Sequence, residues 1–107
     1  MKKYVYIAGP ITKGPRPANI HNALMAGNRI VEAGHVPFVP HLFELWDIVS
    51  PQPYEFWMTM DFCWLRKCDA VLRLPGESAG ADRECCEADR LGLPVFEDMD
   101  VLMRWLA

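Results

Sequence analysis

The sequence predicts a three-layer α/β sandwich, a flavodoxin-like or Rossmann-like doubly wound domain with a parallel sheet of four to five strands. Short β-branched or aromatic runs alternate with segments of helical periodicity, and this strand–helix order occurs four times. Such an order requires parallel strands joined by right-handed crossovers. The 107 residues, 51% of them hydrophobic, can form one core, and no linker divides them. We therefore expect a single domain over residues 1–107.

The first part of the chain is predicted to form a strand, a helix and an edge strand. Residues 3–9 are β-branched and aromatic, and the three prolines of residues 10–18 indicate a loop. Asn19 is the expected N-cap of a helix that ends at Gly34. The two prolines of residues 35–40 favour a strand at an edge of the sheet. Five apolar residues recur at helical spacing in the predicted helix: Ile20, Ala23, Leu24, Ile30 and Val31.

The second part begins with an aromatic-rich connection, residues 41–53, in which we expect no more than a helical turn. The segment that follows has helical periodicity through Phe56, Met60, Cys63 and Trp64. Gly92 is the expected end of the next helix. The predicted elements are a helix over 54–68, a strand over 69–76, a helix over 78–92, a strand over 93–96 and a helix over 97–107.

Composition argues against several classes of function. A formal charge of −3 and a pI near 5.5 do not suit a protein that binds a nucleic-acid polymer. No apolar run reaches the ~20 residues of a membrane span, and the apolar run at the N-terminus is too short for a signal peptide, so we expect a soluble, cytoplasmic protein. The cysteines (Cys63, Cys68, Cys85 and Cys86) form no CxxC pair. We expect buried, reduced thiols rather than a metal site, and no cofactor.

The predicted sheet also says where a ligand would bind. In open α/β sheets, ligands bind outside the carboxyl ends of the strands. The segments that leave those ends carry Lys13 and Arg16 in a Gly/Pro loop that starts at Gly9, then His41 with Trp46. These segments are far apart in the sequence but should converge in space.

The turn after the third predicted strand is the most informative of these segments. Pro75, Gly76 and Gly80 allow a ligand to approach the backbone closely, and Ser78 can cap the following helix. The free N–H groups of such a helix start bind anions. The spacing is neither GxGxxG nor a Walker loop, so dinucleotide or ATP binding has little support. The alternative is that Ser78 only caps the helix.

Four acidic residues could each have either a catalytic or a structural role. Glu84 lies about a turn and a half into the helix and could act as a nucleophile or a general base, although it could also be an ordinary surface residue, as could Glu87. Asp61 lies among aromatic residues, so burial should disfavour its ionisation, which suits an acid. Asp69 opens a strand at the end opposite the predicted site, where a structural cap is the simpler interpretation.

Three segments, YVYIAGPIT, MDFCWLRKCDAVLRLPG and SAGADRECCEADRLGLPVF, resemble the nucleoside 2-deoxyribosyltransferase superfamily, which includes the 2′-deoxynucleoside 5′-monophosphate N-glycosidases. The resemblance covers nearly the whole chain. It implies a flavodoxin-like fold, a homodimer or higher oligomer, and cleavage of an N-glycosidic bond. In the family pattern the glutamate six residues after a polar residue is the nucleophile, which matches Glu84 after Ser78. Asp61 and Tyr6 match two further catalytic positions.

The resemblance also bears on the substrate. Monophosphate hydrolases of the superfamily have a serine where the transferases have an aspartate, so Ser78 favours a nucleotide, with Lys13 or Arg16 holding its phosphate. The resemblance implies an enzyme that acts on a small nucleoside or nucleotide through a glycosyl-enzyme intermediate. The alternatives are a nucleotide-binding or sensor domain without catalysis, and a purely structural oligomer. The expected substrate-binding residues are Gly9, Lys13, Arg16, His41, Trp46, Gly76, Ser78 and Gly80, beside the catalytic Glu84, Asp61 and Tyr6.

Overall fold

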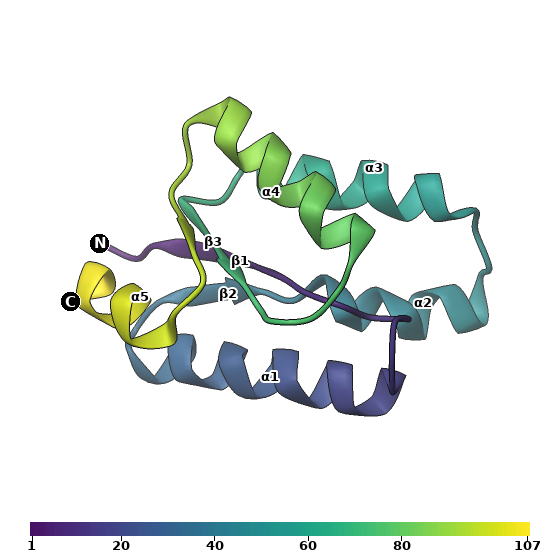
Figure 1. Ribbon diagram of the computed structural model, residues 1–107, viewed down its shortest axis with the longest axis horizontal. Helices are drawn as coiled ribbons and strands as arrows, with labels where there is room; N and C mark the ends of the chain where they lie inside the picture. The colour runs from purple at the N-terminus through teal and green to yellow at the C-terminus, as the bar shows by residue number, and fades with distance from the viewer.

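A computed structural model describes all residues, 1–107, and contains a parallel sheet of four strands between two layers of helices (Figure 1). The strand order is β2-β1-β3-β4, and each neighbouring pair is parallel. The predicted three-layer α/β fold is therefore confirmed, with the proline-containing β2 at an edge. The elements are β1 (Tyr4–Ala8), α1 (Arg16–Glu32), β2 (Val36–Phe38), a 3₁₀ turn (Pro40–Leu42), α2 (Phe43–Val49), α3 (Tyr54–Leu65), β3 (Ala70–Arg73), α4 (Ala79–Leu91), β4 (Val95–Phe96) and α5 (Met99–Leu106).

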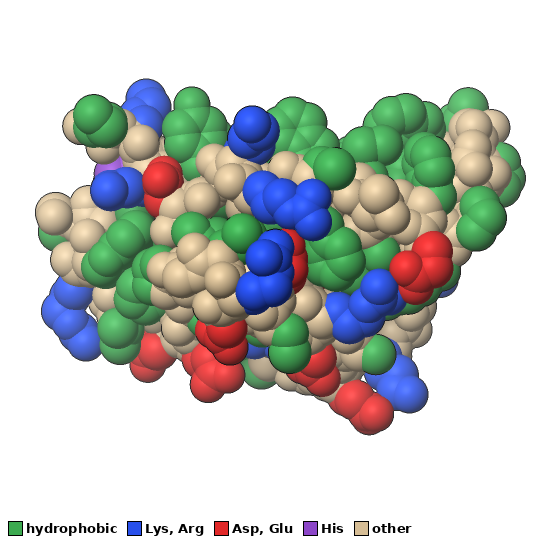
Figure 2. Space-filling view, turned by 90° about the horizontal axis from the view of Figure 1, so that it is seen from above, with side chains coloured by type: hydrophobic (Ala, Val, Ile, Leu, Met, Phe, Trp, Pro, Cys, Tyr) green, Lys and Arg blue, Asp and Glu red, His purple; other side chains and the backbone are tan.

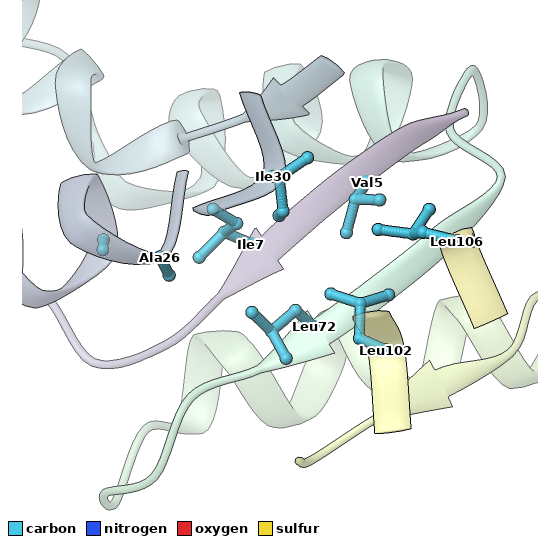
Figure 3. Packing of buried hydrophobic residues seen from close by; sticks show 8 residues of the cluster. Val5, Ile7, Ala26, Ile30, Leu72, Leu102 and Leu106 are labelled. Atoms are coloured by element: carbon cyan, nitrogen blue, oxygen red, sulfur yellow. The ribbon is translucent and has the colours of Figure 1, made fainter. Parts of the chain in front are cut away.

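Two hydrophobic clusters lie on opposite faces of the sheet because side chains alternate along each strand. Val5 and Ile7 of β1 pack with α1 and α5 on one face (Figure 3). Tyr6 and Ala8 point to the other face, which α3 and α4 cover. Figure 1 shows the same division, with α1 and α5 on one side of the sheet and α3 and α4 on the other. Tyr6 therefore points into the layer that carries Asp61 and Glu84.

Helix α1 begins earlier than the sequence predicts. It starts at Arg16 with Pro15 at the N-cap, so the expected cap at Asn19 is wrong. Prolines are well tolerated in the first turn of a helix, where no intrahelical N–H bond is required. The Asn19 amide instead donates to the carbonyl oxygens of Ile11 and Lys13, at 3.1 and 2.8 Å. Asn19 thus fixes the loop that leads from β1 to α1.

Two further predictions about packing are wrong. Val31 is 58% exposed, although its spacing suggested the core. Helix α3 buries Met58, Asp61 and Leu65, whereas the face predicted from periodicity is largely exposed, with Phe56 at 40% and Trp64 at 47%. Helix α3 is apolar nearly all round, and periodicity cannot identify the inward face of such a helix.

Helix α2 lies within the connection for which only a helical turn was expected. Around α2 and the start of α3, large apolar side chains are exposed, and Figure 2 shows hydrophobic side chains gathered at the end of the molecule where Figure 1 places the turn from α2 to α3. The patch consists of Leu45, Trp46, Ile48, Val49, Tyr54 and Phe56. Apolar surface gathered in one place is typical of interaction surfaces.

Gly76 provides a test of how tightly the loops beside the sheet are packed. Its φ is +115°, and a Cβ atom added there would lie 2.9 Å from Cγ of Pro10. We expect Gly76→Ala to lower the free energy of unfolding by about 1–3 kcal/mol, because it adds a clash to an unfavourable backbone conformation. Gly14 is the matched control, since its φ is +80° but no atom lies within 4 Å of its added Cβ. Urea denaturation should show the larger loss for Gly76→Ala, and equal losses would contradict the close packing.

Candidate active site

A cavity of about 420 Å³ opens where the loop after β1, helices α2 and α3, and the start of α4 meet. Its lining includes Asp61 of α3 and Glu84 of α4, together with Gly9, Lys13 and Ser78. The loop after β1 and the turn before α4 leave the carboxyl ends of parallel strands, where open α/β sheets bind ligands. The structure therefore brings together segments that lie far apart in the sequence.

Glu84 and Tyr6 form a short hydrogen bond in the protein interior. The Tyr6 hydroxyl donates to Oε2 of Glu84 at 2.5 Å. Tyr6 is fully buried, and Glu84 is only 5% exposed. Burial, and then the charges of Glu84 and Asp61, raise the pKa of Tyr6 well above its ordinary value, so the hydroxyl keeps its proton. Tyr6 therefore holds one oxygen of the Glu84 carboxylate in a fixed place.

Asp61 is the second buried carboxyl group of the cavity, 6% exposed. Its pKa is raised, chiefly by burial and then by the negative charge of Glu84. This agrees with the expectation from its aromatic surroundings. Oδ1 of Asp61 is buried and makes no hydrogen bond within the protein. Because buried polar atoms are almost always bonded, an atom without a partner beside a cavity is available to a ligand or a water molecule.

The surroundings of the two carboxyl groups act differently on their pKa values. Burial raises the pKa of Glu84 as well, but hydrogen bonds from Tyr6 and Asp61 and the charge of Arg73 act in the opposite direction. For Asp61, the charge of Glu84 adds to the effect of burial. These surroundings favour Glu84 as the ionised member of the pair and Asp61 as the protonated one. Paired carboxyl groups whose environments separate their pKa values are typical of acid and base assignments in enzymes.

This arrangement should lower stability as the pH rises. Between the pKa of an unfolded aspartate, about 3.9, and the raised pKa in the folded protein, the native state holds a proton that the unfolded state has released. The free energy of unfolding then falls with pH, by about 1.4 kcal/mol for each unit that separates the two pKa values. We expect Asp61→Asn to reduce this slope, because the amide does not titrate.

Urea denaturation at pH 5, 7 and 8.5 measures the effect. The matched control is Asp89→Asn, which replaces an exposed aspartate of α4. A slope that Asp61→Asn leaves unchanged would mean that Asp61 is ionised in the folded protein at neutral pH.

The start of α4 forms the polar end of the cavity. Ser78 is the N-cap, and its hydroxyl accepts from the N–H of Ala81 at 3.1 Å. The N–H groups of Ala79 and Gly80, both in the lining, belong to the first turn and have no acceptor within the helix. Lys13 lies across from them, 3.8 Å from the Glu77 carboxylate. The helix start and Lys13 could together hold an anionic group.

Four of the predicted substrate-binding residues do not line this cavity. Arg16 forms an ion pair with Glu44 at 3.4 Å, and it is Glu44 that faces the cavity. Trp46 lies behind the wall, packed edge-on against Phe43 and Trp57. His41 is buried, and burial lowers its pKa below the ordinary value. Its Nε2 lies 3.2 Å from the Pro10 carbonyl oxygen. These three residues support the cavity from outside, and Gly76, the fourth, packs against Pro10.

Sequence reasoning missed much of the cavity wall. Phe43 and Asp47 of α2 line the cavity, as do Tyr54 and Met58 of α3. The rings of Phe43 and Trp57 are stacked with centroids 5.5 Å apart. Phe43 and Asp47 are four residues apart, so they share one face of a helix. This spacing would have indicated the wall had residues 43–49 been predicted as a helix.

The remaining residues singled out in the sequence serve the scaffold. Oδ2 of Asp69 accepts from the Tyr4 N–H at 2.8 Å, which ties β3 to β1. Glu87 pairs with Arg66 and Arg90, and hydrogen bonds from Arg90 are the main cause that lowers the pKa of Glu87 to about 2.

The cysteines differ in their exposure. Cys68 is buried and Cys85 half-buried, but Cys63 and Cys86 are exposed, so the prediction of four buried thiols is wrong. Adjacent helical positions face different directions, which separates Cys85 from Cys86. No group of three or more possible metal ligands occurs in the structure.

Comparison with known proteins places the chain in a family. The model of a family described as a domain of unknown function (DUF7768) matches residues 3–98. The chain belongs to this family. A comparison with curated proteins finds no match. Every residue of the cavity lies within the part of the chain that the DUF7768 model covers.

Among solved structures, the DUF7768 chain is similar to a 2-deoxyribosyltransferase from the psychrotolerant bacterium Bacillus psychrosaccharolyticus. The TM-score is 0.66 at 21% sequence identity, and the match covers 86% of this chain and 69% of the other. At this identity the likeness concerns the fold. The chain thus has the nucleoside 2-deoxyribosyltransferase-like fold that its three sequence segments predict. None of its helices has the length and apolar character that crossing a membrane requires.

Proposed function

We propose that this protein cleaves the N-glycosidic bond of a nucleoside or nucleoside 5′-monophosphate, with Glu84 as nucleophile. The observation that carries the proposal is the buried pair of carboxyl groups in the cavity, Glu84 and Asp61, with the Tyr6 hydroxyl bonded to Glu84. Burial raises the pKa of both groups, and the charge of Glu84 raises that of Asp61 further, which favours a protonated Asp61 beside an ionised Glu84. An ionised nucleophile and a protonated acid are the two groups that retaining glycoside chemistry requires. The likeness of the fold to a 2-deoxyribosyltransferase supports the same chemistry.

In the first step, the Glu84 carboxylate attacks C1′ of the sugar, and the bond between C1′ and the base nitrogen breaks. The base leaves with the electron pair and receives the proton of Asp61, directly or through a water molecule. Tyr6 donates to Oε2 of Glu84, so the carboxylate meets C1′ in one orientation. The product of this step is a covalent ester between the sugar and Glu84.

In the second step, Asp61 is the base. Its carboxylate takes a proton from water, or from a second nucleobase, as that molecule attacks C1′ and the bond to Glu84 breaks. Water as acceptor gives a hydrolase, whereas a second base gives a transferase. Both outcomes use the same residues, so the acceptor has to be determined by experiment.

The start of α4 suits the sugar end of the substrate. The free N–H groups of Ala79 and Gly80, the Ser78 hydroxyl and Lys13 could hold a 5′-phosphate or a 5′-hydroxyl. Arg16, which the sequence suggested for this task, is paired with Glu44. Lys13 likewise lies 3.8 Å from a carboxylate, that of Glu77, but it lines the cavity and Arg16 does not, so Lys13 is the cation that we assign to a phosphate.

A panel of deoxynucleosides, ribonucleosides and their 5′-monophosphates tests the proposal, with the free base measured by chromatography. Release of base from at least one substrate, with or without a second base as acceptor, is the expected result. Binding that raises the melting temperature without any base release would instead favour the nucleotide-binding or sensor domain. The homodimer or higher oligomer stays a prediction, for which the apolar patch of α2 and α3 provides a surface and sedimentation provides the measurement.

A further inference from the structure

Asp47 is a charged residue of the cavity wall to which the proposed reaction gives no task. It lies on α2 and lines the cavity. Its Oδ1 accepts two hydrogen bonds, from Nε1 of Trp57 at 2.7 Å and from the N–H of Gln52 at 3.0 Å. Two donors from different segments fix the orientation of the carboxylate. Its other oxygen, Oδ2, accepts no hydrogen bond within the protein and is free for a ligand.

The charge of Asp47 is maintained by the same contacts. The bond from Gln52 and then the bond from Trp57 lower the pKa of Asp47 below its ordinary value. Of the neighbouring carboxylates, Glu44 is already paired with Arg16 at 3.4 Å. Asp47 is thus an ionised acceptor in the cavity wall, without a cation bonded to it. An ionised carboxylate accepts hydrogen bonds and cannot donate them.

The position of Asp47 relative to the carboxyl pair follows from helix α3. Trp57 precedes Asp61 by four residues, so the two side chains share one face and are about 6 Å apart along the helix axis. Both line the cavity, and Asp47 is bonded to Trp57. A base attached to C1′ beside Glu84 and Asp61 would extend along this face toward Asp47. The stacked rings of Phe43 and Trp57 form the apolar wall beside it.

We propose that Asp47 selects nucleobases that carry an exocyclic amino group on the edge far from the sugar, namely adenine and cytosine. The inference rests on the proposed function, since it assigns the base end of the same cavity. An amino group there donates to Oδ2 of Asp47. Hypoxanthine and uracil carry a carbonyl oxygen at the same place, which would set two acceptors against each other. Since a hydrogen bond to a charged group contributes about 1.5–3 kcal/mol, the preference should be roughly 10- to 100-fold.

The test measures binding in the Glu84→Gln variant, which should not turn substrate over. The probes are two pairs, 2′-deoxyadenosine against 2′-deoxyinosine and 2′-deoxycytidine against 2′-deoxyuridine, each also as its 5′-monophosphate. Calorimetry should give dissociation constants roughly 10- to 100-fold lower for the amino member of each pair. Equal affinities within the pairs would overturn the proposal, as would the absence of binding of any probe to both Glu84→Gln and the unsubstituted protein.

A second variant assigns the preference to Asp47. Asp47→Asn keeps the shape and one oxygen for the Trp57 bond, but it offers an amide N–H₂ that can donate to a carbonyl group. In Glu84→Gln/Asp47→Asn the preference should shrink to less than about threefold or reverse, because the charge-assisted bond is lost. The matched control, Asp89→Asn on the exposed face of α4, should leave it unchanged. A preference that survives Asp47→Asn would overturn the assignment to Asp47.

The two proposals can fail separately. Selective binding of the amino probes with no base release from the unsubstituted protein would contradict the proposed reaction and leave the role of Asp47 intact. Base release with equal kcat/KM from both members of each pair would support the reaction and contradict the role of Asp47. The ligand comparison with Asp47 in place does not depend on the Asp47→Asn variant, so it stands if that variant folds poorly.

Discussion

Replacing Glu84 by glutamine is expected to reduce base release by roughly 10³-fold or more, because an amide cannot serve as the nucleophile that attacks C1′. Glutamine has nearly the same shape as glutamate, and its side-chain oxygen can still accept from the Tyr6 hydroxyl that now bonds to Oε2. Ligand affinity should therefore change little. The measurement is the rate of base release with the best substrate of the panel, together with calorimetric binding of the same substrate.

The matched control is Glu32→Gln, which makes the same chemical change at an exposed position of α1. It should retain full activity and full stability. Full activity in Glu84→Gln would contradict the assignment of the nucleophile. A loss of both activity and binding in Glu84→Gln would mean that the residue acts in binding, and the covalent mechanism would then lack support.

A covalent intermediate provides an independent readout. If Glu84 forms an ester with the sugar, rapid quenching of the reaction followed by mass spectrometry should find the sugar attached to the peptide that carries this residue. A burst of base release equal to the enzyme concentration should precede the steady state when the second step is slower. Neither signal is expected in Glu84→Gln.

The location of the cavity could be predicted from the sequence because it depends on topology. Once the four strands are parallel, the loop after β1 and the turn before α4 must lie at the same edge of the sheet. Lys13, Ser78 and Glu84 therefore meet in one cavity, although they lie in separate parts of the chain. Their roles in catalysis and binding remain predictions.

The composition of the cavity wall could not be predicted in the same way. The segment from His41 to Pro53 contains aromatic residues and ends in two prolines, which suggested a connection, yet residues 43–49 form a helix that packs against Trp57. Tertiary packing among the aromatic rings stabilises this short helix, and such packing cannot be recognised from the helix propensities of the segment alone. The partner of Arg16 could not be predicted from the sequence either. A cation in a loop can pair with a carboxylate, here Glu44, as readily as with a phosphate.

The inward face of α3 shows a further limit. The helix is apolar on most sides, so the hydrophobic pattern alone cannot place Asp61. The resemblance to the deoxyribosyltransferases pointed to Asp61, and the structure places its side chain in the lining of the cavity. A buried aspartate that the protein leaves partly unbonded reduces stability. Such a residue is typical of functional sites, where stability is given up for chemistry.

Replacing Asp61 by asparagine is expected to reduce base release by roughly 10²–10⁴-fold, because the leaving base then receives no proton from the protein. Burial and the charge of Glu84 raise the pKa of Asp61, so the acid is protonated at neutral pH and loses its proton only as the pH rises. Activity should therefore fall at alkaline pH as Asp61 ionises, and at acid pH as Glu84 becomes protonated. Asp61→Asn should lose the alkaline decrease and keep the acid one.

The leaving group distinguishes an acid from a residue that only shapes the cavity. An N7-methylated purine deoxynucleoside carries a positive charge on its base and releases it without protonation. If Asp61 is the acid, Asp61→Asn should lose far less activity with this substrate than with the unmethylated purine, whereas Asp89→Asn should lose none with either. Equal losses with both substrates would assign Asp61 to positioning, because a defect in binding geometry does not depend on whether the base needs a proton.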